Sequence, residues 1–221
     1  LYMIDDPTIT TEVLGWCRGQ LSDELLDVTV IALQRNSGFA LACNNGVLAA
    51  DTPEVCLLNS DVLPIQPGWL QPLFRTRLMV PEAMVAPLLL TDEGQIQHAG
   101  MTAQPLGLGD LPACVHSLKG LDPQQLKALS PDGLPYDVEL LSGAALMFER
   151  KRFLELGGFD PVFGRGDFED LDFSLRWRQA GGRLQLVPSA RLTPLERQSI
   201  THQQDPLTQW RGVLTAWQAK Q

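Results

Sequence analysis

Strand-like and helix-like segments alternate in the first 60 residues, and this alternation limits the possible folds more than any other feature. Short runs of β-branched and aliphatic residues cover 1–4, 28–33 and 55–58, and apolar residues recur at helical spacing over 10–26 and 39–50. Strands separated by helices predict an α/β domain with a parallel sheet. The polar clusters "DDPT", "QRNSG" and "NSDV" follow the strand-like runs. Ligands of open α/β sheets bind outside the carboxyl ends of the strands, so we expect a binding site there.

The pattern changes in the second part of the chain. A helix is expected over 68–80 and a buried strand over 84–90, whereas residues 91–135 are rich in Gly and Pro, as in hairpins and long loops. The apolar run "VELLSGAALMFER" then leads to a helix over 170–180 that a Gly-Gly pair ends. Residues 201–221 carry tryptophans and aliphatic residues at helical spacing, which predicts a C-terminal helical tail.

The overall charge excludes nucleic acid as a partner. The 221 residues include 17 basic and 26 acidic side chains, a net charge of −9. Phosphate backbones require clustered Lys and Arg, and a small anionic ligand would need local help from a divalent cation held by carboxylates. Four cysteines without C-x-x-C spacing and the lack of an apolar run of about 20 residues predict a reduced, cytoplasmic protein. Residues 1–4 resemble a buried strand, so the sequence is expected to begin within a fold.

Acidic residues at two places in the sequence are candidate metal-binding or catalytic residues. Asp61 follows the strand-like run 55–58, where a carboxylate can bind a hard cation together with phosphate oxygens, or can serve as an ordinary turn or helix-cap residue. The second group is Asp167, Glu169, Asp170 and Asp172, which follow the glycine-rich "GGFDPVFGRG". Acids in a first helical turn are stabilised by the helix dipole, which explains one or two of them. The glycines before them favour a backbone that approaches a ligand or moves around it.

Five segments in this order resemble family 2 glycosyltransferases of bacterial surface polysaccharide synthesis. They are "DDPT", "NSGFALACNNG", "LLNSDV", "GQIQHAG" and "LLSGAALMFERKRFLELGGFDPVFGRGDFEDLDFSLRWRQAGG", and the resemblance extends to about Ser199. It implies a GT-A fold, in which helices flank a mixed, mostly parallel sheet. Residues 1–90 would form the nucleotide-binding half and 91–200 the acceptor-binding half. A dinucleotide dehydrogenase is excluded, because no G-x-G-x-x-G follows a strand.

The resemblance implies a role for particular residues. Such an enzyme transfers a sugar from a nucleotide-diphosphate donor to an acceptor hydroxyl with inversion. Asp170 would be the catalytic base and Glu169 its orienting neighbour, and Asp61 would bind the metal and the diphosphate. The residues expected against the nucleotide are Asp5, Asp6, Asn36, Gly38 and Asn59. Arg176 and Trp177 on the same helix are expected to be a solvated charge and a core aromatic.

Direct displacement requires a base and a stabilised leaving group, but no enzyme nucleophile. No Ser or Cys has a plausible His partner, since the chain has only His98, His116 and His202. The expected donor is a uridine, thymidine or guanosine diphosphate sugar, and the expected acceptor is a glycan or a lipid-linked molecule. The protein would act in the cytoplasm. Two further options are peripheral attachment to the inner face of the membrane and membership of a larger multidomain protein.

Two departures from the family leave alternatives open. The family's metal-binding histidine is replaced by Pro194 in "RLTPLERQS". Either Glu196 or His202 substitutes for it, or Mg²⁺ or Mn²⁺ is held by Asp61 and the donor's phosphates, or metal binding is weakened. The first strand of the family, which supports the base, is also missing from the sequence. These departures favour a second hypothesis, a degenerate glycosyltransferase-like domain that binds without catalysis. A nucleotidyltransferase would need a glycine-rich basic phosphate loop, which the sequence lacks.

Overall fold

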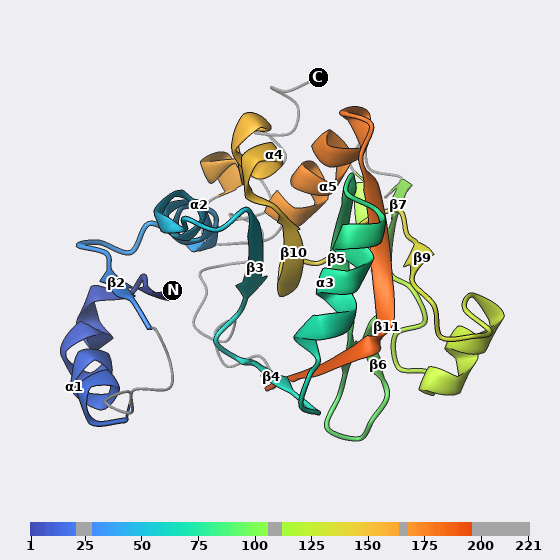
Figure 1. The fold of residues 1–221 in the computed structure, drawn as a ribbon, viewed down its shortest axis with the longest axis horizontal. Coiled ribbons are helices and arrows are strands. Elements are labelled where there is room, and N and C mark those ends of the chain that lie inside the picture. The colour runs from blue at the N-terminus through green and yellow to red at the C-terminus, as the bar shows by residue number, and fades with distance from the viewer. Residues whose placement is uncertain (21–27, 106–111, 164–167, 196–221) are drawn as a thin grey trace.

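A seven-stranded mixed sheet forms the centre of the protein in the computed structural model, which describes residues 1–20, 28–105, 112–163 and 168–195 (Figure 1). The main path of the sheet runs through β3 (Glu54–Leu58), β10 (Ala145–Glu149), β5 (Ala83–Leu90), β11 (Arg183–Pro194) and β4 (Val62–Pro64). Two short strands extend it: β6 (Ile96–His98) pairs with β5, and β9 (Tyr136–Asp137) pairs with β11. Flanking helices complete the expected α/β architecture.

The sheet is mixed, as predicted, but it is not mostly parallel in its pairings. Among its described pairs only β5 and β11 run parallel, and β10 lies antiparallel between β3 and β5. Helix α3 (Leu70–Met79) lies between β3 and β5 in the chain, and these two strands point the same way. Strand β10, which lies between β3 and β5 in the sheet, comes later in the chain, after the 91–144 segment. Helix α4 (Arg150–Glu155) follows β10 directly. An antiparallel strand needs no crossover helix, so β10 can fill this place in the sheet.

Strand β5 lies at the centre of the core, because all eight of its residues are buried. Its alternate side chains face opposite layers. Ala83 and Val85 pack with Leu73 of α3 on one face. Met84 and Ala86 pack on the other face against α2 (Phe39–Ala49), α4 and α5 (Glu169–Gln179). A strand covered on both faces carries an unbroken apolar run, which is why this strand could be predicted from the sequence.

Aromatic rings fill the layer between the sheet and helices α4 and α5. Phe148, Phe153, Phe159, Phe173 and Trp177 are all fully buried, and Phe148 stacks on Phe153 with ring centroids 4.6 Å apart. Trp177 is therefore the predicted core aromatic, and its indole N–H donates to the Glu82 carbonyl over 3.0 Å.

The prediction that Arg176 is a solvated charge is wrong. Its guanidinium forms an ion pair with Asp172 at 2.6 Å and donates to the carbonyl oxygens of Leu156 and Gly158. Those carbonyls belong to the turn between α4 and the short helix η3 (Pro161–Phe163). Arg176 thus ties that turn to α5, a contact between segments that the sequence does not place together.

The N-terminal segment forms a separate parallel pair, β1 (Tyr2–Ile4) with β2 (Val30–Ala32). The turn η1 (Pro7–Ile9) and helix α1 (Thr10–Gln20) follow β1, and α2 packs against it, with an ideal Cβ on Gly46 lying 3.3 Å from the Met3 side chain. A strand forms at Tyr2–Ile4 within the predicted run 1–4, but the prediction that it is buried is wrong, since only Ile4 is buried and Tyr2 is 40% exposed. Within the described residues β1 pairs with β2 alone, so one of its edges is not covered by a strand.

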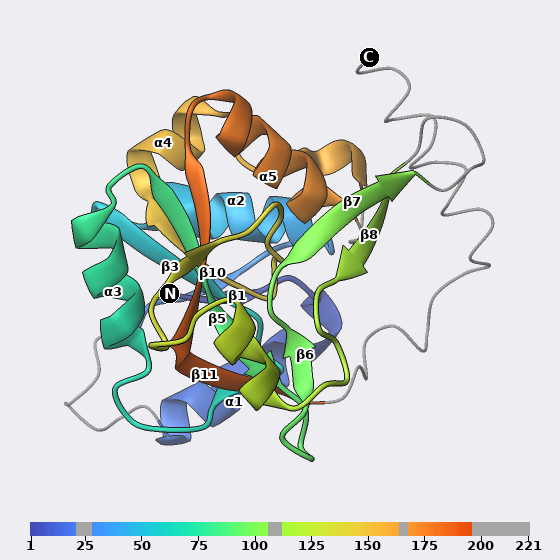
Figure 2. The ribbon, with the colours of Figure 1, turned by 90° about the vertical axis from the view of Figure 1, so that its right-hand side faces the viewer.

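The Gly- and Pro-rich region forms a hairpin, as expected. Strands β7 (Met101–Pro105) and β8 (Pro112–His116) pair antiparallel apart from the main sheet (Figure 2), and the 3₁₀ helix η2 (Pro123–Ala128) follows. No helix among the described residues has the length and apolar character to cross a membrane. Asp167, Glu196, His202 and the predicted tail 201–221 lie outside the described residues.

Candidate functional site

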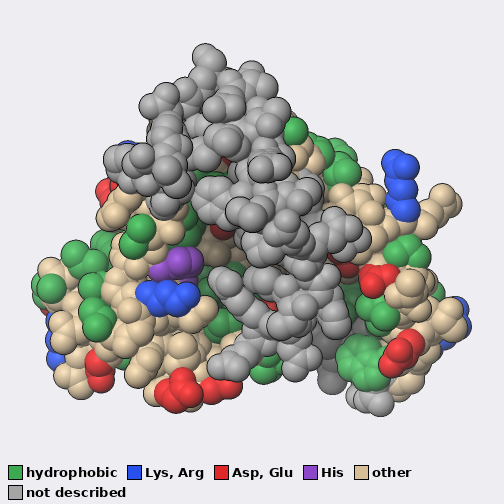
Figure 3. Space-filling view, turned by 180° about the vertical axis from the view of Figure 1, so that it is seen from behind, with side chains coloured by type: hydrophobic (Ala, Val, Ile, Leu, Met, Phe, Trp, Pro, Cys, Tyr) green, Lys and Arg blue, Asp and Glu red, His purple; other side chains and the backbone are tan. Residues whose placement is uncertain are grey.

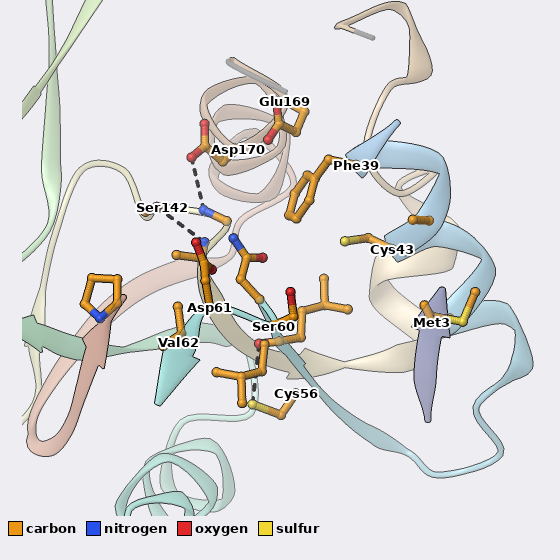
Figure 4. A pocket seen from close by; sticks show the side chains of 18 of the residues that line it. Met3, Phe39, Cys43, Cys56, Ser60, Asp61, Val62, Ser142, Glu169 and Asp170 are labelled. Atoms are coloured by element: carbon orange, nitrogen blue, oxygen red, sulfur yellow. Dashed lines mark hydrogen bonds between the residues drawn. The ribbon is translucent and has the colours of Figure 1, made fainter. Parts of the chain in front are cut away.

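One large pocket opens where the ends of β1 and β3, the start of α2 and the start of α5 meet (Figure 4). It is an open cleft with a volume of about 2090 Å³, larger than the roughly 300–1,000 Å³ of a small-molecule site. The described residues that the sequence predicts at the nucleotide, the metal or the base all line it, as does Pro194: Asp5, Asp6, Asn36, Gly38, Asn59, Asp61, Glu169 and Asp170. The structure therefore brings together acids that lie 165 residues apart in the sequence (170 − 5).

Asp61 lies in a tight turn between β3 and β4. The Asn59 amide donates to the Ala144 carbonyl over 3.0 Å, and the Val62 amide donates to the Asn59 carbonyl over 3.1 Å. The Leu195 amide donates to the Asp61 carbonyl over 2.6 Å, which joins this turn to the end of β11. Pro194 lies opposite Val62 in the strand register, so the proline that replaces the expected histidine is next to the turn that carries Asp61.

Asp170 is held by two backbone amides at the beginning of α5. Its Oδ1 accepts a hydrogen bond from the Leu171 amide over 2.8 Å, and its Oδ2 accepts one from the Gly143 amide over 3.0 Å. Gly143 is closely packed, since an ideal Cβ there would lie 3.3 Å from the Phe39 ring, a tight contact, and 3.5 Å from the Asp170 Cβ. Phe168, just before the helix, has φ of 78°, a strained conformation for a non-glycine residue that is often found at functional sites.

Two of the predicted nucleotide-binding residues also shape the local backbone. Asp6 caps the turn η1, since its Oδ1 accepts from the Thr8 amide over 2.9 Å. Asn36 closes an Asx turn by accepting from the Gly38 amide over 3.1 Å, and Gly38 begins α2 with φ of 83°. These contacts account for the "NSG" motif, because a positive φ favours glycine. Asp5 is half-buried at the end of β1.

Two buried or partly buried thiols border the acids of the pocket. Burial, and then Glu169 and Asp5, raise the pKa of the Cys43 thiol to about 12. Burial, and then Asp170, Glu139 and Glu169, raise the pKa of the Cys114 thiol to about 12. Both thiols stay protonated at neutral pH and are unsuitable as nucleophiles.

The pocket is strongly acidic. Its acidic lining residues are Asp5, Asp6, Asp51, Glu54, Asp61, Asp92, Glu169 and Asp170, whereas Lys119 is its only Lys or Arg within the described residues. Such a lining repels a diphosphate unless a cation accompanies it.

The donor set fits a hard cation that its ligand helps to bind. No three His, Cys, Asp or Glu side chains are grouped as a metal site in the part of the chain that the structure describes. Pro194 cannot coordinate a metal, and Glu196 and His202 lie outside the described residues. Mg²⁺ and Mn²⁺ usually retain open positions that phosphate oxygens and water fill, so the Asp61 carboxylate fits a cation shared with a diphosphate.

Sequence reasoning assigned no role to four residues on another wall of the pocket: His98, His116, Ser142 and Gly143. The available signal was the histidine in "GQIQHAG", yet the sequence does not reveal which residue His98 meets.

Comparisons with known proteins point to one class. No protein-family model matches the chain. It is 26% identical over 189 residues to a putative polypeptide N-acetylgalactosaminyltransferase 13 of Drosophila melanogaster, covering 85% of this chain and 33% of the relative. It is 30% identical over 165 residues to the pre-mycofactocin glycosyltransferase of Mycobacterium tuberculosis, covering 74% of this chain and 31% of the relative. The chain thus spans about a third of the length of these relatives.

Solved structures agree with this result. GalNAc-T7 with UDP, GalNAc and Mn²⁺ superimposes with a TM-score of 0.68 at 21% identity, covering 89% of this chain and 37% of that one. The mannosyltransferase PcManGT of Pyrobaculum calidifontis, with GDP-Man and Mn²⁺, gives a TM-score of 0.55 at 14% identity, covering 87% and 46%. At these identities the likeness establishes the fold.

Proposed function

The chain has the GT-A fold and is related to glycosyltransferases, and on this premise we propose that it transfers a sugar from a nucleotide-diphosphate donor to an acceptor hydroxyl with inversion. The observation that carries the proposal is the convergence of Asp5, Asp61 and Asp170 on one pocket. Residues 1–90 would bind the nucleotide and 91–200 the acceptor, in the cytoplasmic synthesis of a cell-surface polysaccharide or glycoconjugate.

Asp5, Asn36 and Gly38 contact the nucleoside in this proposal, and Asp61 faces the diphosphate. A divalent cation bound there with the donor would stabilise the charge of the leaving nucleoside diphosphate. Asn59 lies in the same turn as Asp61, which fits a contact to the diphosphate side.

Asp170 is proposed to remove the acceptor proton. The acceptor oxygen forms a bond to the anomeric carbon, the bond from that carbon to the diphosphate oxygen breaks, and the hydroxyl proton moves to the Asp170 carboxylate. The Gly143 and Leu171 amides orient this carboxylate, and the buried Glu169 lies beside it on α5. One displacement inverts the anomeric centre, and the protonated thiols of Cys43 and Cys114 agree with a mechanism without a covalent enzyme intermediate.

A binding module without catalysis is the second candidate. It is favoured by Pro194 beside Asp61 and by the absence of a grouped metal site within the described residues. Turnover separates the two hypotheses, since a binding module shifts in melting temperature with a ligand but releases no nucleoside diphosphate.

The proposal is tested by a thermal-shift screen of UDP-, dTDP- and GDP-sugars with and without Mn²⁺. At least one donor should raise the melting temperature more with Mn²⁺ than without it, because a ligand that binds the native state stabilises it. Asp61→Ala should lose the Mn²⁺-dependent part of this shift. Asp132→Ala, an exposed acid that does not line the pocket, is the matched control and should behave as wild type.

Two results would contradict the proposal. If no sugar nucleotide raises the melting temperature and none is converted to its nucleoside diphosphate, the proposal that the protein is a transferase is wrong. If the anomeric proton coupling of the product shows retained configuration, the inverting mechanism is wrong although transfer stands.

Pro194→His is expected to increase the affinity for Mn²⁺ measured in the presence of the preferred nucleoside diphosphate. Imidazole is a good ligand for this ion, and the register of Pro194 with Val62 places the new side chain beside the Asp61 turn. Without nucleotide, the wild-type protein should bind little Mn²⁺. Arg191→His, an exposed position on the same strand that does not line the pocket, serves as the control. An unchanged affinity in Pro194→His would mean that this position does not face the cation.

A further inference from the structure

The cleft has a further wall, at which the sequence predicted neither the nucleotide nor the metal. This hairpin wall consists of the cleft-lining residues of β6, of the end of β8 and of the turn 117–120: Gln97, His98, His116 and Lys119. Its two histidines lie close together, with their Nδ1 atoms 3.3 Å apart. Figure 3 shows histidine atoms beside a Lys or Arg side chain at the surface of the molecule, so part of this wall faces solvent.

Lys119 is the only Lys or Arg that lines the cleft within the described residues, whereas eight of the lining residues are Asp or Glu. It is exposed, and it belongs to none of the ion pairs found in the described part of the chain. Asp92, which follows β5 into the cleft, instead accepts a hydrogen bond from the Thr193 hydroxyl over 3.4 Å. The Lys119 ammonium group is therefore available to a ligand, and it is the point on the described lining where a negative group is least repelled.

The backbone that presents Lys119 is strained. Leu118 has a φ of 58°, and Phe168 is the one other non-glycine residue with a positive φ in the described part of the chain. Phe168 lines the cleft directly before the acids of α5. A positive φ is costly for a bulky side chain and persists only where the surrounding structure fixes it, commonly at ligand-binding and active sites. At Leu118 the side chain supplies this contact, since it packs against the buried cluster that contains Leu88 and Ile96.

Hydrogen bonds between the turn and β6 bring Gln97 alongside Lys119. The Gly120 amide donates to the Ile96 carbonyl over 2.7 Å, and the Ile96 amide donates to the Leu121 carbonyl over 2.8 Å. Gln97 is half-buried between two buried neighbours on β6, so its side chain points to the opposite face of the strand from theirs, and it lines the cleft. Its side-chain amide has no hydrogen-bond partner within the described residues. An ammonium group and a free carboxamide thus lie next to one another.

We propose that Lys119 and Gln97 bind an anionic group of the acceptor, a carboxylate or a phosphate, while the reacting hydroxyl of the acceptor lies at Asp170. The inference rests on the proposed transferase function and names the class of its acceptor. Lys119 attracts the negative charge, and the Gln97 amide donates to an oxygen of the same group.

The acids of the cleft make this subsite selective. A negative group placed elsewhere along the described lining would face carboxylates, so an anionic acceptor has one favourable orientation. The donor's diphosphate is the other anion of the proposed reaction. It is proposed to lie at Asp61, in the turn between β3 and β4, whereas Gln97 and Lys119 belong to the segment proposed to bind the acceptor. The two anions are thereby kept at different places in the cleft.

Binding is tested first, without turnover, by saturation-transfer NMR titrations in the presence of UDP and Mn²⁺. The probes are matched pairs: methyl glucoside with methyl glucuronide for the carboxylate, and glucose with glucose 6-phosphate for the phosphate. The anionic member of at least one pair should bind about tenfold more tightly, as for a charge-assisted hydrogen bond at an exposed site. In 1 M NaCl, where the Debye length is about 3 Å, this preference should shrink. The pair with the larger preference identifies the group.

Three variants assign the preference to this subsite. Lys119→Gln should abolish it, and Lys119→Arg, which keeps the charge, should retain most of it. Lys127→Gln is the matched control, since Lys127 is an exposed lysine of η2 that does not line the cleft, and it should behave as wild type.

Transfer is then measured with UDP-GalNAc and GDP-mannose as donor probes and the same pairs as acceptors. The ratio of kcat/KM for an anionic acceptor to that for its neutral counterpart should fall by about tenfold in Lys119→Gln, mainly through KM, because the lysine binds a part of the acceptor that does not react. Gln97→Glu should lower the ratio as well, because the new carboxylate pairs with Lys119 and repels the anion.

The outcomes separate the subsite from the transferase function. Equal affinities within every pair, or an unchanged preference in Lys119→Gln, would overturn the subsite even if transfer is observed. If Lys119→Gln weakened the binding of UDP as much as that of the anionic sugar, the lysine would serve the donor's diphosphate and the acceptor role would be wrong. A preference that depends on Lys119 in a protein that transfers no sugar would support the anion site and reject the proposed function.

Discussion

Asp170→Asn is expected to lower the rate of sugar transfer by about 10²–10⁴-fold, the usual contribution of a general base, while donor binding changes little. The amide has nearly the shape of the carboxylate, and its oxygen can still accept from the Gly143 amide, so the loop before β10 should keep its position. What is lost is the ability to take the acceptor proton. Transfer is measured as release of nucleoside diphosphate, and donor binding as the Mn²⁺-dependent thermal shift.

The control for this prediction is Asp137→Asn. Asp137 is an exposed carboxylate on β9 that pairs with Arg183 at 2.7 Å, outside the pocket, and its loss should leave transfer near the wild-type rate. Asp61→Ala should instead weaken metal-dependent donor binding, the property that Asp170→Asn leaves nearly unchanged. If Asp61→Ala and Asp170→Asn had the same binding and kinetic profiles, the separate roles of the two acids would have to be given up.

Much of the secondary structure could be predicted because its signals are local. Strand β5 has an unbroken apolar run, and α5 begins with acids and ends before Gly181, where φ is 77°. The direction of β10 could not be predicted in this way. A strand buried on both faces has the same apolar composition whether its neighbours run parallel or antiparallel, and the pairing depends on how the whole chain returns to the sheet.

The candidate site was predictable to a similar extent. Asp61 was singled out because it follows a strand and Asp170 because it belongs to an acidic group at a helix start, whereas Asp5 and the separate roles of all three came from the resemblance to family 2 glycosyltransferases. The bonds that orient them were not predictable, since Gly143 meets Asp170 only after β10 and α5 have packed. The partner of His98 is 18 residues away on another strand, so their contact depends on hairpin register.

Arg77 illustrates a tertiary contact on which the fold is expected to depend strongly. It is an α3 residue that is 3% exposed, and its guanidinium forms two parallel hydrogen bonds with Glu54 of β3, at 2.9 and 3.0 Å. Its Nη1 also donates to the carbonyl oxygens of Val80, Pro81 and Ala83, which lead into β5. One side chain therefore joins the helix to two strands and satisfies several buried acceptors.

Arg77→Met is expected to lower the free energy of unfolding by about 1–3 kcal/mol, because the carbonyl oxygens of Pro81 and Ala83 lose their donor and the half-buried Glu54 carboxylate loses its partner. Denaturant unfolding measures the change. The matched control is Arg75→Met, an exposed position on the same helix, which should change stability by no more than about 0.5 kcal/mol. Combining Arg77→Met with Glu54→Met should restore part of the loss, since the orphaned carboxylate is then removed as well. If Arg77→Met were as mild as Arg75→Met, or if the double variant were less stable than Arg77→Met alone, the uncompensated charge would not be the cause.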